Sequence, residues 1–143
     1  MQRAPQSVEQ LELLLSEPST AVVELLGKLP GDIMFLGVGG KMGPTMARMA
    51  RRASDLAGVK RRVIGVSRFS TAGQRERLES WSIDTITCDL LNPEAVAQLP
   101  DAALVVSMSG YKFGAAQNPE MTWATNCLIP AQICRRFHNS RIV

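Results

Sequence analysis

Histidine and cysteine, the residues that bind most protein metals, are scarce in this sequence. His138 stands alone, and the three cysteines, Cys88, Cys127 and Cys134, form no CxxC pair. These residues cannot complete a zinc-finger ligand set, so we expect no metal site. An odd number of cysteines without a pairing pattern indicates buried thiols in a reducing compartment.

Long apolar runs are also missing. No stretch approaches the roughly 20 residues that an α-helix needs to span a bilayer. Residues 1–10 lack the apolar centre of a signal peptide. We therefore expect a soluble cytoplasmic protein with no membrane partner.

Aromatic residues make up only 5% of the chain, and the net charge of +3 is a mild basic bias. Basic residues gather between positions 48 and 62, with no aromatic residue between them. This pattern predicts a solvated face rather than a nucleic-acid surface. The basic residues are Arg48, Arg51, Arg52, Lys60, Arg61 and Arg62.

The first 31 residues predict a helical extension. Ser7 and Gln10 form a capping-box pattern for a helix over residues 7–15. A second helix is expected to begin after Ser19 and to run to about Gly27. The turn that follows, at residues 29–32, separates this extension from the remainder, residues 32–143.

Residues 32–143 alternate between short apolar runs and helical patterns. Strands are expected at 33–36, 62–67, 85–88, 103–107 and 141–143, and helices at 44–56, 71–81, 93–99 and 121–137. This alternation predicts an α/β fold: a doubly wound parallel sheet between two helix layers, with strand order 3-2-1-4 and onward. The fold is the Rossmann type, and because the chain stops in the fifth strand we expect it to be truncated there.

The spacing within two of these helices predicts which residues are buried. In residues 44–56 the expected apolar face is Met46, Met49, Ala50, Ala53 and Leu56. In the last helix, Trp123, Cys127, Cys134 and Phe137 fall at helical spacing and are expected in the core. Pro130 predicts a kink in that helix.

The glycine-rich segment FLGVGGKMG, residues 35–43, lies between a strand and a proline-started helix, where phosphate groups bind. A triphosphate loop, GxxxxGK[ST], is excluded because Met42 stands at its second glycine. GxGxxG fails at the same position. GxxGxxG fits Gly37, Gly40 and Gly43, so we expect a dinucleotide turn that also includes Gly39, Lys41 and Met42. A glycine-rich turn without a ligand stays an alternative.

The end of the second strand distinguishes two dinucleotides. An acid there binds the ribose 2′-hydroxyl of NAD, whereas a basic residue accommodates the 2′-phosphate of NADP. This chain has Ser67 and Arg68 and no acid. The segment favours NADP over NAD, unless Arg68 is only a surface residue.

The glycine spacing, the segment CDLLNP at 88–93 and Asn126 resemble the N-terminal part of the NAD-dependent epimerase/dehydratase family, among the extended short-chain dehydrogenases. The resemblance covers about residues 32–143. It implies that Asp89 and Leu90 contact adenine, although Asp89 also suits a turn or helix cap. It further implies that Ser109 and Gly110 lie along the cofactor and that Asn126 supports the site. Lys112, nearby, meets an anion or is solvated.

The sequence departs from that family in two places. Ile129 and Pro130 stand where the family often has Gly-Thr. The family's catalytic Tyr-x-x-x-Lys lies after strand five, whereas the single tyrosine, Tyr111, has Ala115 in place of the lysine. We therefore expect no catalytic residue in this chain.

The resemblance implies the NAD(P)-binding portion of an oxidoreductase that acts on a nucleotide-sugar or similar small molecule. This portion alone is not expected to be active. The alternative is a sensor that binds NAD(P) without catalysis. A methyltransferase is less favoured, because those proteins commonly use an acid after strand two. The oligomeric state stays open, a homodimer included.

Overall fold

The computed structural model describes residues 4–112 and 116–143. It contains a parallel five-stranded sheet with the order β3-β2-β1-β4-β5, which confirms the doubly wound arrangement. The strands are β1 (Ile33–Leu36), β2 (Val63–Ser67), β3 (Asp84–Thr87), β4 (Leu104–Ser107) and β5 (Arg141–Ile142).

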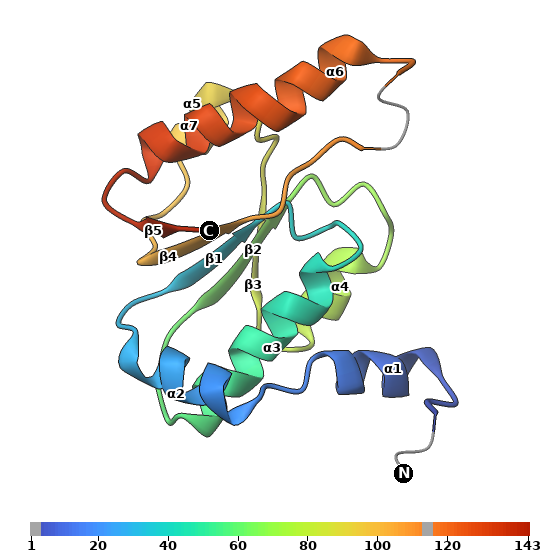
Figure 1. Cartoon of the computed structure of the whole chain (residues 1–143), viewed down its shortest axis with the longest axis vertical. Coiled ribbons are helices and arrows are strands. Elements are labelled where there is room, and N and C mark those ends of the chain that lie inside the picture. Colours follow the sequence, from blue (N-terminus) through green and yellow to red (C-terminus); the bar gives the residue numbers. More distant parts are fainter. Residues whose placement is uncertain (1–3, 113–115) are drawn as a thin grey trace.

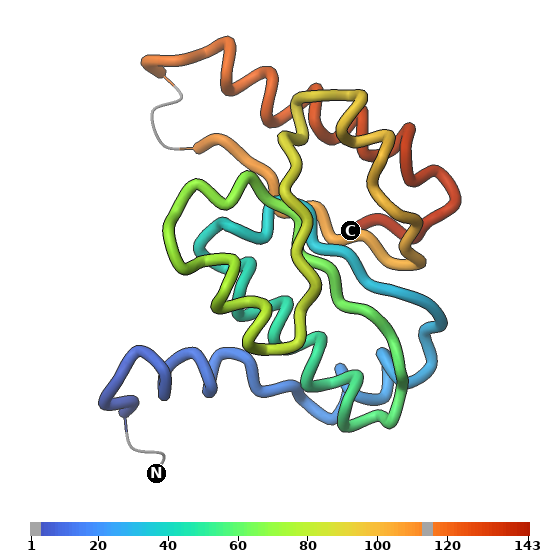
Figure 2. Tube along the Cα trace, turned by 180° about the vertical axis from the view of Figure 1, so that it is seen from behind, coloured from blue at the N-terminus to red at the C-terminus, as the bar shows by residue number. Residues whose placement is uncertain are grey.

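Helices cover both faces of the sheet and give three layers (Figure 1). One layer holds α2 (Thr20–Lys28), α3 (Gly43–Leu56) and α4 (Gln74–Glu79). The other holds α5 (Pro93–Ala97) and a long helix made of α6 (Pro119–Trp123), a π-helical turn η1 (Ala124–Leu128) and α7 (Ile129–Arg136). Figure 2 shows the first helix, α1 (Val8–Leu15), outside these layers beyond α3 and α4.

The central strand β1 is apolar throughout because both of its faces are covered. Ile33 and Phe35 pack in the cluster that includes the α3 alanines. Met34 and Leu36 point the other way, into the cluster with Ile129 and Ile133 of α7. Side chains alternate across a strand, so a strand buried on both faces has a continuous apolar run.

The buried stripe of α3 differs from the predicted one. Small residues, Ala47, Ala50 and Ala53, face the sheet, while Leu56 is 69% exposed. The prediction that Leu56 is buried is therefore wrong. Alanines let the helix backbone lie close to the sheet, and this contact rotates the larger side chains to the edge of the interface.

The long helix contains the π-helical turn η1 directly before α7, whose second residue is Pro130, and the kink expected at Pro130 stays a prediction. Proline lacks an N–H, and a change from i−4 to i−5 bonding accommodates the missing donor. The wider turn also shifts the helical register. As a result Phe137 is buried as predicted, but Trp123 is 70% exposed, and Cys127 and Cys134 are exposed as well. Among the three thiols only Cys88 lies in the core.

The N-terminal helices are attached through the basic residues between 48 and 62. Arg61, only 9% exposed, donates from Nη2 to the carbonyl oxygens of Leu26 (2.5 Å) and Leu29 (2.7 Å). Arg52 Nη1 donates to Leu13 O at 2.8 Å. The expectation of a solvated basic face is wrong for Arg61, because its guanidinium satisfies the last carbonyls of α2.

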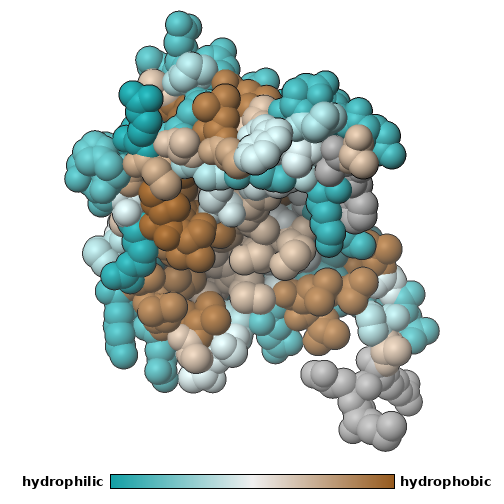
Figure 3. All heavy atoms as spheres, turned by 45° about the horizontal axis from the view of Figure 1, so that its top comes forward, coloured by the Kyte–Doolittle hydropathy of each residue, from teal (hydrophilic) through white to brown (hydrophobic). Residues whose placement is uncertain are grey.

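Apolar side chains also reach the surface. Val8, Leu13 and Leu15 of α1 and Trp123 and Leu128 of the long helix are among the exposed ones. Figure 3 shows that apolar surface on one side of the molecule is divided among several patches by polar side chains. Within the described residues, no helix is long and apolar enough to cross a membrane.

We expect Arg61→Ala to lower the free energy of unfolding by about 2–3 kcal/mol, because two buried carbonyls lose a charged donor. Arg62→Ala is the matched control. Its exposed ion pair with Asp84 is 2.7 Å long and should contribute less than about 1 kcal/mol. Urea denaturation of both variants checks this, and equal losses would contradict the role given to Arg61.

Candidate functional site

The strand order places a crevice beside β1. The chain leaves β1 for β2 and β3, then crosses back to β4 on the other side. Ligands of open α/β sheets bind at such a reversal, beyond the carboxyl ends of the strands. A pocket of about 290 Å³ lies there, lined by segments that follow β1, β2, β3 and β4.

The glycine turn after β1 forms one wall of this pocket. Gly37 has a φ of +81°, a conformation that favours glycine. A Cβ on Gly39 would lie 2.5 Å from Ser67 Oγ, and one on Gly43 would lie 2.1 Å from Val38 O. The φ of Gly37 and the backbone contact at Gly43 favour glycine at these two positions. At Gly39 the crowding comes from side-chain oxygens of Ser67 and Gln74, which could rotate away.

Gly40 has a different role from the one that the GxxGxxG spacing predicts. A Cβ on Gly40 would lie 3.5 Å from Gly37 O, which is an ordinary contact. Position 39 is therefore the more crowded of the two, through the side-chain oxygens of Ser67 and Gln74. Gly40 does line the pocket, so a side chain there would occupy ligand space without disturbing the turn.

The α3 helix begins at this turn and presents its N-terminus there. Its N-cap residue in the described chain, Met42, makes no side-chain capping bond. The first amides of a helix carry partial positive charge and are suited to an anion. Lys41 and Met42 themselves are exposed and do not line the pocket. Gly43 is buried against Val38.

The segment after β2 contributes the charged wall. Ser67 and Arg68 line the pocket as predicted, and Ser70, Thr71 and Gln74 join them. Arg68 is exposed, and no ion pair within the described residues involves it. This loop therefore presents one positive charge and several hydroxyl groups to a ligand.

The segment after β3 forms the next part of the wall. Asp89 is exposed, and its Oδ1 accepts a hydrogen bond from Leu91 N at 3.0 Å. The carboxylate thus stabilises its own turn and retains a second oxygen. Leu90 is buried. Burial, and to a smaller extent the charge of Asp89, raises the pKa of the Cys88 thiol, so this cysteine at the pocket is a poor nucleophile.

The segment after β4 passes directly over Gly37. A Cβ on Gly37 would lie 3.0 Å from Ser109 Oγ and 3.1 Å from Ser109 N. Ser109 and Gly110, which were expected along the cofactor, line the pocket. Ser109 Oγ is one of the buried side-chain atoms, within the described residues, that have no hydrogen-bond partner in the chain. This hydroxyl is therefore available to a water molecule or a ligand.

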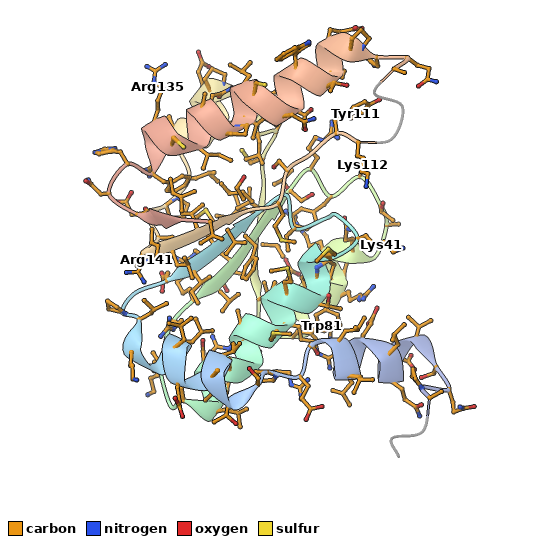
Figure 4. The ribbon with its side chains drawn as sticks, viewed as in Figure 1. Lys41, Trp81, Tyr111, Lys112, Arg135 and Arg141 are labelled. Atoms are coloured by element: carbon orange, nitrogen blue, oxygen red, sulfur yellow. The ribbon has the colours of Figure 1, made fainter. Side chains whose placement is uncertain are left out.

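Asn126 lies outside the pocket and acts on the chain that forms it. Its Oδ1 accepts from Tyr111 N at 2.8 Å, and its Nδ2 donates to Tyr111 O at 3.0 Å. The long helix is thereby fastened to the segment after β4. Lys112, for which the sequence left both an anion contact and solvation open, follows this contact and does not line the pocket. Lys41 and Lys112 lie on the same side of the molecule in Figure 4. Ala115, relevant to the missing Tyr-x-x-x-Lys, falls outside the described residues.

Several residues that line the pocket were not predicted from the sequence. Ser70 and Thr71 follow Arg68 within three residues, so their hydroxyl groups near a basic residue were a usable signal. Gln74, Met108, Met121, Thr125 and Ile129 had no such signal. The last three come from the long helix, and only the crossing of that helix over the sheet brings them to this edge.

No family model and no curated protein matches the chain. Several solved structures are similar to it, among them the following two. One, described as the X-ray structure of Pen from Bacillus thuringiensis, has 16% identity and a TM-score of 0.61, over 73% of this chain and 33% of that one. The other, described as cmcI-D160 Mg-SAM, has 24% identity and a TM-score of 0.42, over 76% of this chain and 46% of that one. The chain thus spans about a third of Pen and less than half of the second protein. The likeness to Pen supports a Rossmann-like fold and carries no statement about ligands.

We expect Gly43→Ala to cost at least about 3 kcal/mol of stability, because its Cβ would overlap a backbone oxygen that cannot move alone. Gly40→Ala is the matched control in the same turn and should stay within about 1 kcal/mol of the wild type. Thermal unfolding followed by circular dichroism measures both. Similar losses in the two variants would contradict the assignment of the obligatory glycines.

Proposed function

We propose that this chain binds a nicotinamide dinucleotide, NADP in preference to NAD, as the cofactor-binding portion of an oxidoreductase related to the epimerase/dehydratase family. The observation that carries the proposal is the pocket in which four strand ends meet: the glycine turn, Ser67 with Arg68, Asp89 with Leu90, and Ser109 with Gly110. These four segments are far apart in the sequence, and they meet at this pocket.

Each wall fits one part of a dinucleotide. The glycine turn and the start of α3 suit the pyrophosphate, because backbone approaches closely there and the helix N-terminus favours negative charge. Arg68, with Ser67 and the hydroxyls of Ser70 and Thr71, suits a 2′-phosphate. The second carboxylate oxygen of Asp89 can accept a hydrogen bond from the amino group of adenine. The unpartnered Ser109 Oγ supports a ligand that runs past Gly37 toward β4.

A bound nicotinamide ring supplies or accepts a hydride. This chain's own residues hold and orient the dinucleotide, while the acid–base pair that such chemistry needs is absent from its 143 residues: Tyr111 is the only tyrosine. The proposed oxidoreductase activity, on a nucleotide-sugar or similar small molecule, therefore belongs to a longer protein. A sensor that binds NAD(P) without catalysis is the second candidate, and the lack of the Tyr-x-x-x-Lys pattern favours it.

The nucleotide sequence of the encoding gene beyond codon 143 distinguishes these candidates. A downstream Tyr-x-x-x-Lys pattern would support the oxidoreductase. A stop codon directly after Val143 would contradict it and leave the sensor.

Isothermal titration of NADP and NAD tests the binding proposal. We expect NADP to bind more tightly, and Arg68→Ala to weaken NADP by about 10- to 100-fold, since a charged hydrogen bond to phosphate contributes about 1.5–3 kcal/mol. NAD lacks that phosphate, so the wild type and Arg68→Ala should bind NAD with similar affinity. Arg135→Ala, an exposed arginine that does not line the pocket, is the control. Failure to bind either dinucleotide would refute the proposal, and equal affinities would refute the role of Arg68.

A further inference from the structure

We propose that Gln74 is a positioning residue that sets the preference between NADP and NAD. The inference rests on the proposed dinucleotide function and names a determinant of its specificity. Gln74 is the first residue of α4, and its side chain lines the pocket. Its Nε2 donates to the carbonyl oxygen of Gly39 at 2.7 Å.

The loop between β2 and α4 lies close to the glycine turn at both of its ends, and a side-chain hydrogen bond joins the two at one end. At its beginning, Ser67 Oγ lies 2.5 Å from the position that a Cβ of Gly39 would take. At its end, Gln74 Oε1 lies 3.0 Å from the same position, and Nε2 makes the bond to Gly39 O. Residues 68–73 are therefore a loop whose two ends both contact one glycine.

The interior of this loop needs such support. Phe69 has a φ of +48°, which is unusual for a residue with a side chain, and Gly73 has a φ of +75°. A Cβ on Gly73 would contact nothing within 4 Å, so the space beside this residue is open. Phe69 packs against the cluster that includes the α3 alanines, and the Arg75 guanidinium lies 5.3 Å from its ring centroid. On the pocket side, Gln74 supplies the hydrogen bond from α4 to the glycine turn.

The consequence differs between the two dinucleotides. The pyrophosphate subsite is shaped by the turn itself, through Gly37 and Gly43. The 2′-phosphate subsite is shaped by the loop that carries Arg68, Ser70 and Thr71. If the loop loses its hydrogen bond to Gly39, it must become ordered when NADP binds. This ordering lowers the affinity for NADP. NAD has no 2′-phosphate and does not use the loop in this way.

The test compares Gln74→Met with Gln98→Met by isothermal titration of both dinucleotides. Methionine has about the same size as glutamine but lacks the Nε2 group that donates to Gly39 O. Gln98, exposed at the C-cap of α5, is the matched control far from Gly39. We expect Gln74→Met to weaken NADP by about three- to tenfold, the effect of one hydrogen bond, and NAD by less than about twofold. Gln74→Glu, which keeps the length but turns an oxygen toward Gly39 O, should reduce the NADP preference further.

Each outcome decides the inference. A fall in the NADP-to-NAD affinity ratio in either Gln74 variant, with the ratio intact in Gln98→Met, supports it. An equal loss for both dinucleotides would show that Gln74 supports the whole turn, and an unchanged ratio would show that it positions nothing. Both results overturn the inference while the dinucleotide proposal stands. A wild-type protein that binds neither dinucleotide would overturn the proposed function itself, and this inference with it.

Discussion

The backbone of the turn after β1 lies close to two other segments of the chain and also folds closely against itself. A Cβ on Gly37 would lie 3.1 Å from Ser109 N, one on Gly43 would lie 2.1 Å from the carbonyl oxygen of Val38 in the same turn, and Gly39 lies beside the Ser67 side chain. Backbone atoms cannot rotate away as side-chain ends do, so the contacts at Gly37 and Gly43 fix the shape of this turn and keep the ends of β1 and β4 close together. The contact at Gly43 also positions the first turn of α3. The alanines of α3 then pack against the sheet, and Leu56 is exposed.

The segments that meet at these strand ends determine the chemical character of the pocket. Its walls are mostly backbone, hydroxyl groups and small side chains, with Arg68 and Asp89 as the charged residues that line it within the described chain. Positive charge thus lies at the edge after β2, and the negative charge follows β3. A ligand with phosphate at one position and an amino-bearing ring at another matches that arrangement. Polar groups fastened to secondary structure, as Asn126 fastens Tyr111, need little reordering when such a ligand binds.

Much of the fold was open to prediction because local patterns carried it. β1 and the order of the sheet agree with expectation, since an apolar run before a glycine turn and a proline-started helix specifies one topology. Predictions failed where an irregular turn inside a helix or a distant segment decided the outcome. Trp123, Cys127 and Cys134 have helical spacing, yet the π turn before Pro130 rotates them to the surface. Arg61 has a sequence context typical of a solvated residue, yet the C-terminus of α2 buries it.

The residue types and their order alone determined an alternating α/β chain, a glycine-rich turn in a phosphate-binding position and a basic residue at the end of β2. These features depend on neighbours in the sequence. Tertiary structure alone decided that Gly39, rather than Gly40, is the more crowded position in the turn, because the nearest atoms there belong to Ser67 at the end of another strand and to Gln74. It also placed Gln74 on that glycine across 35 residues of chain, a contact for which no local pattern exists.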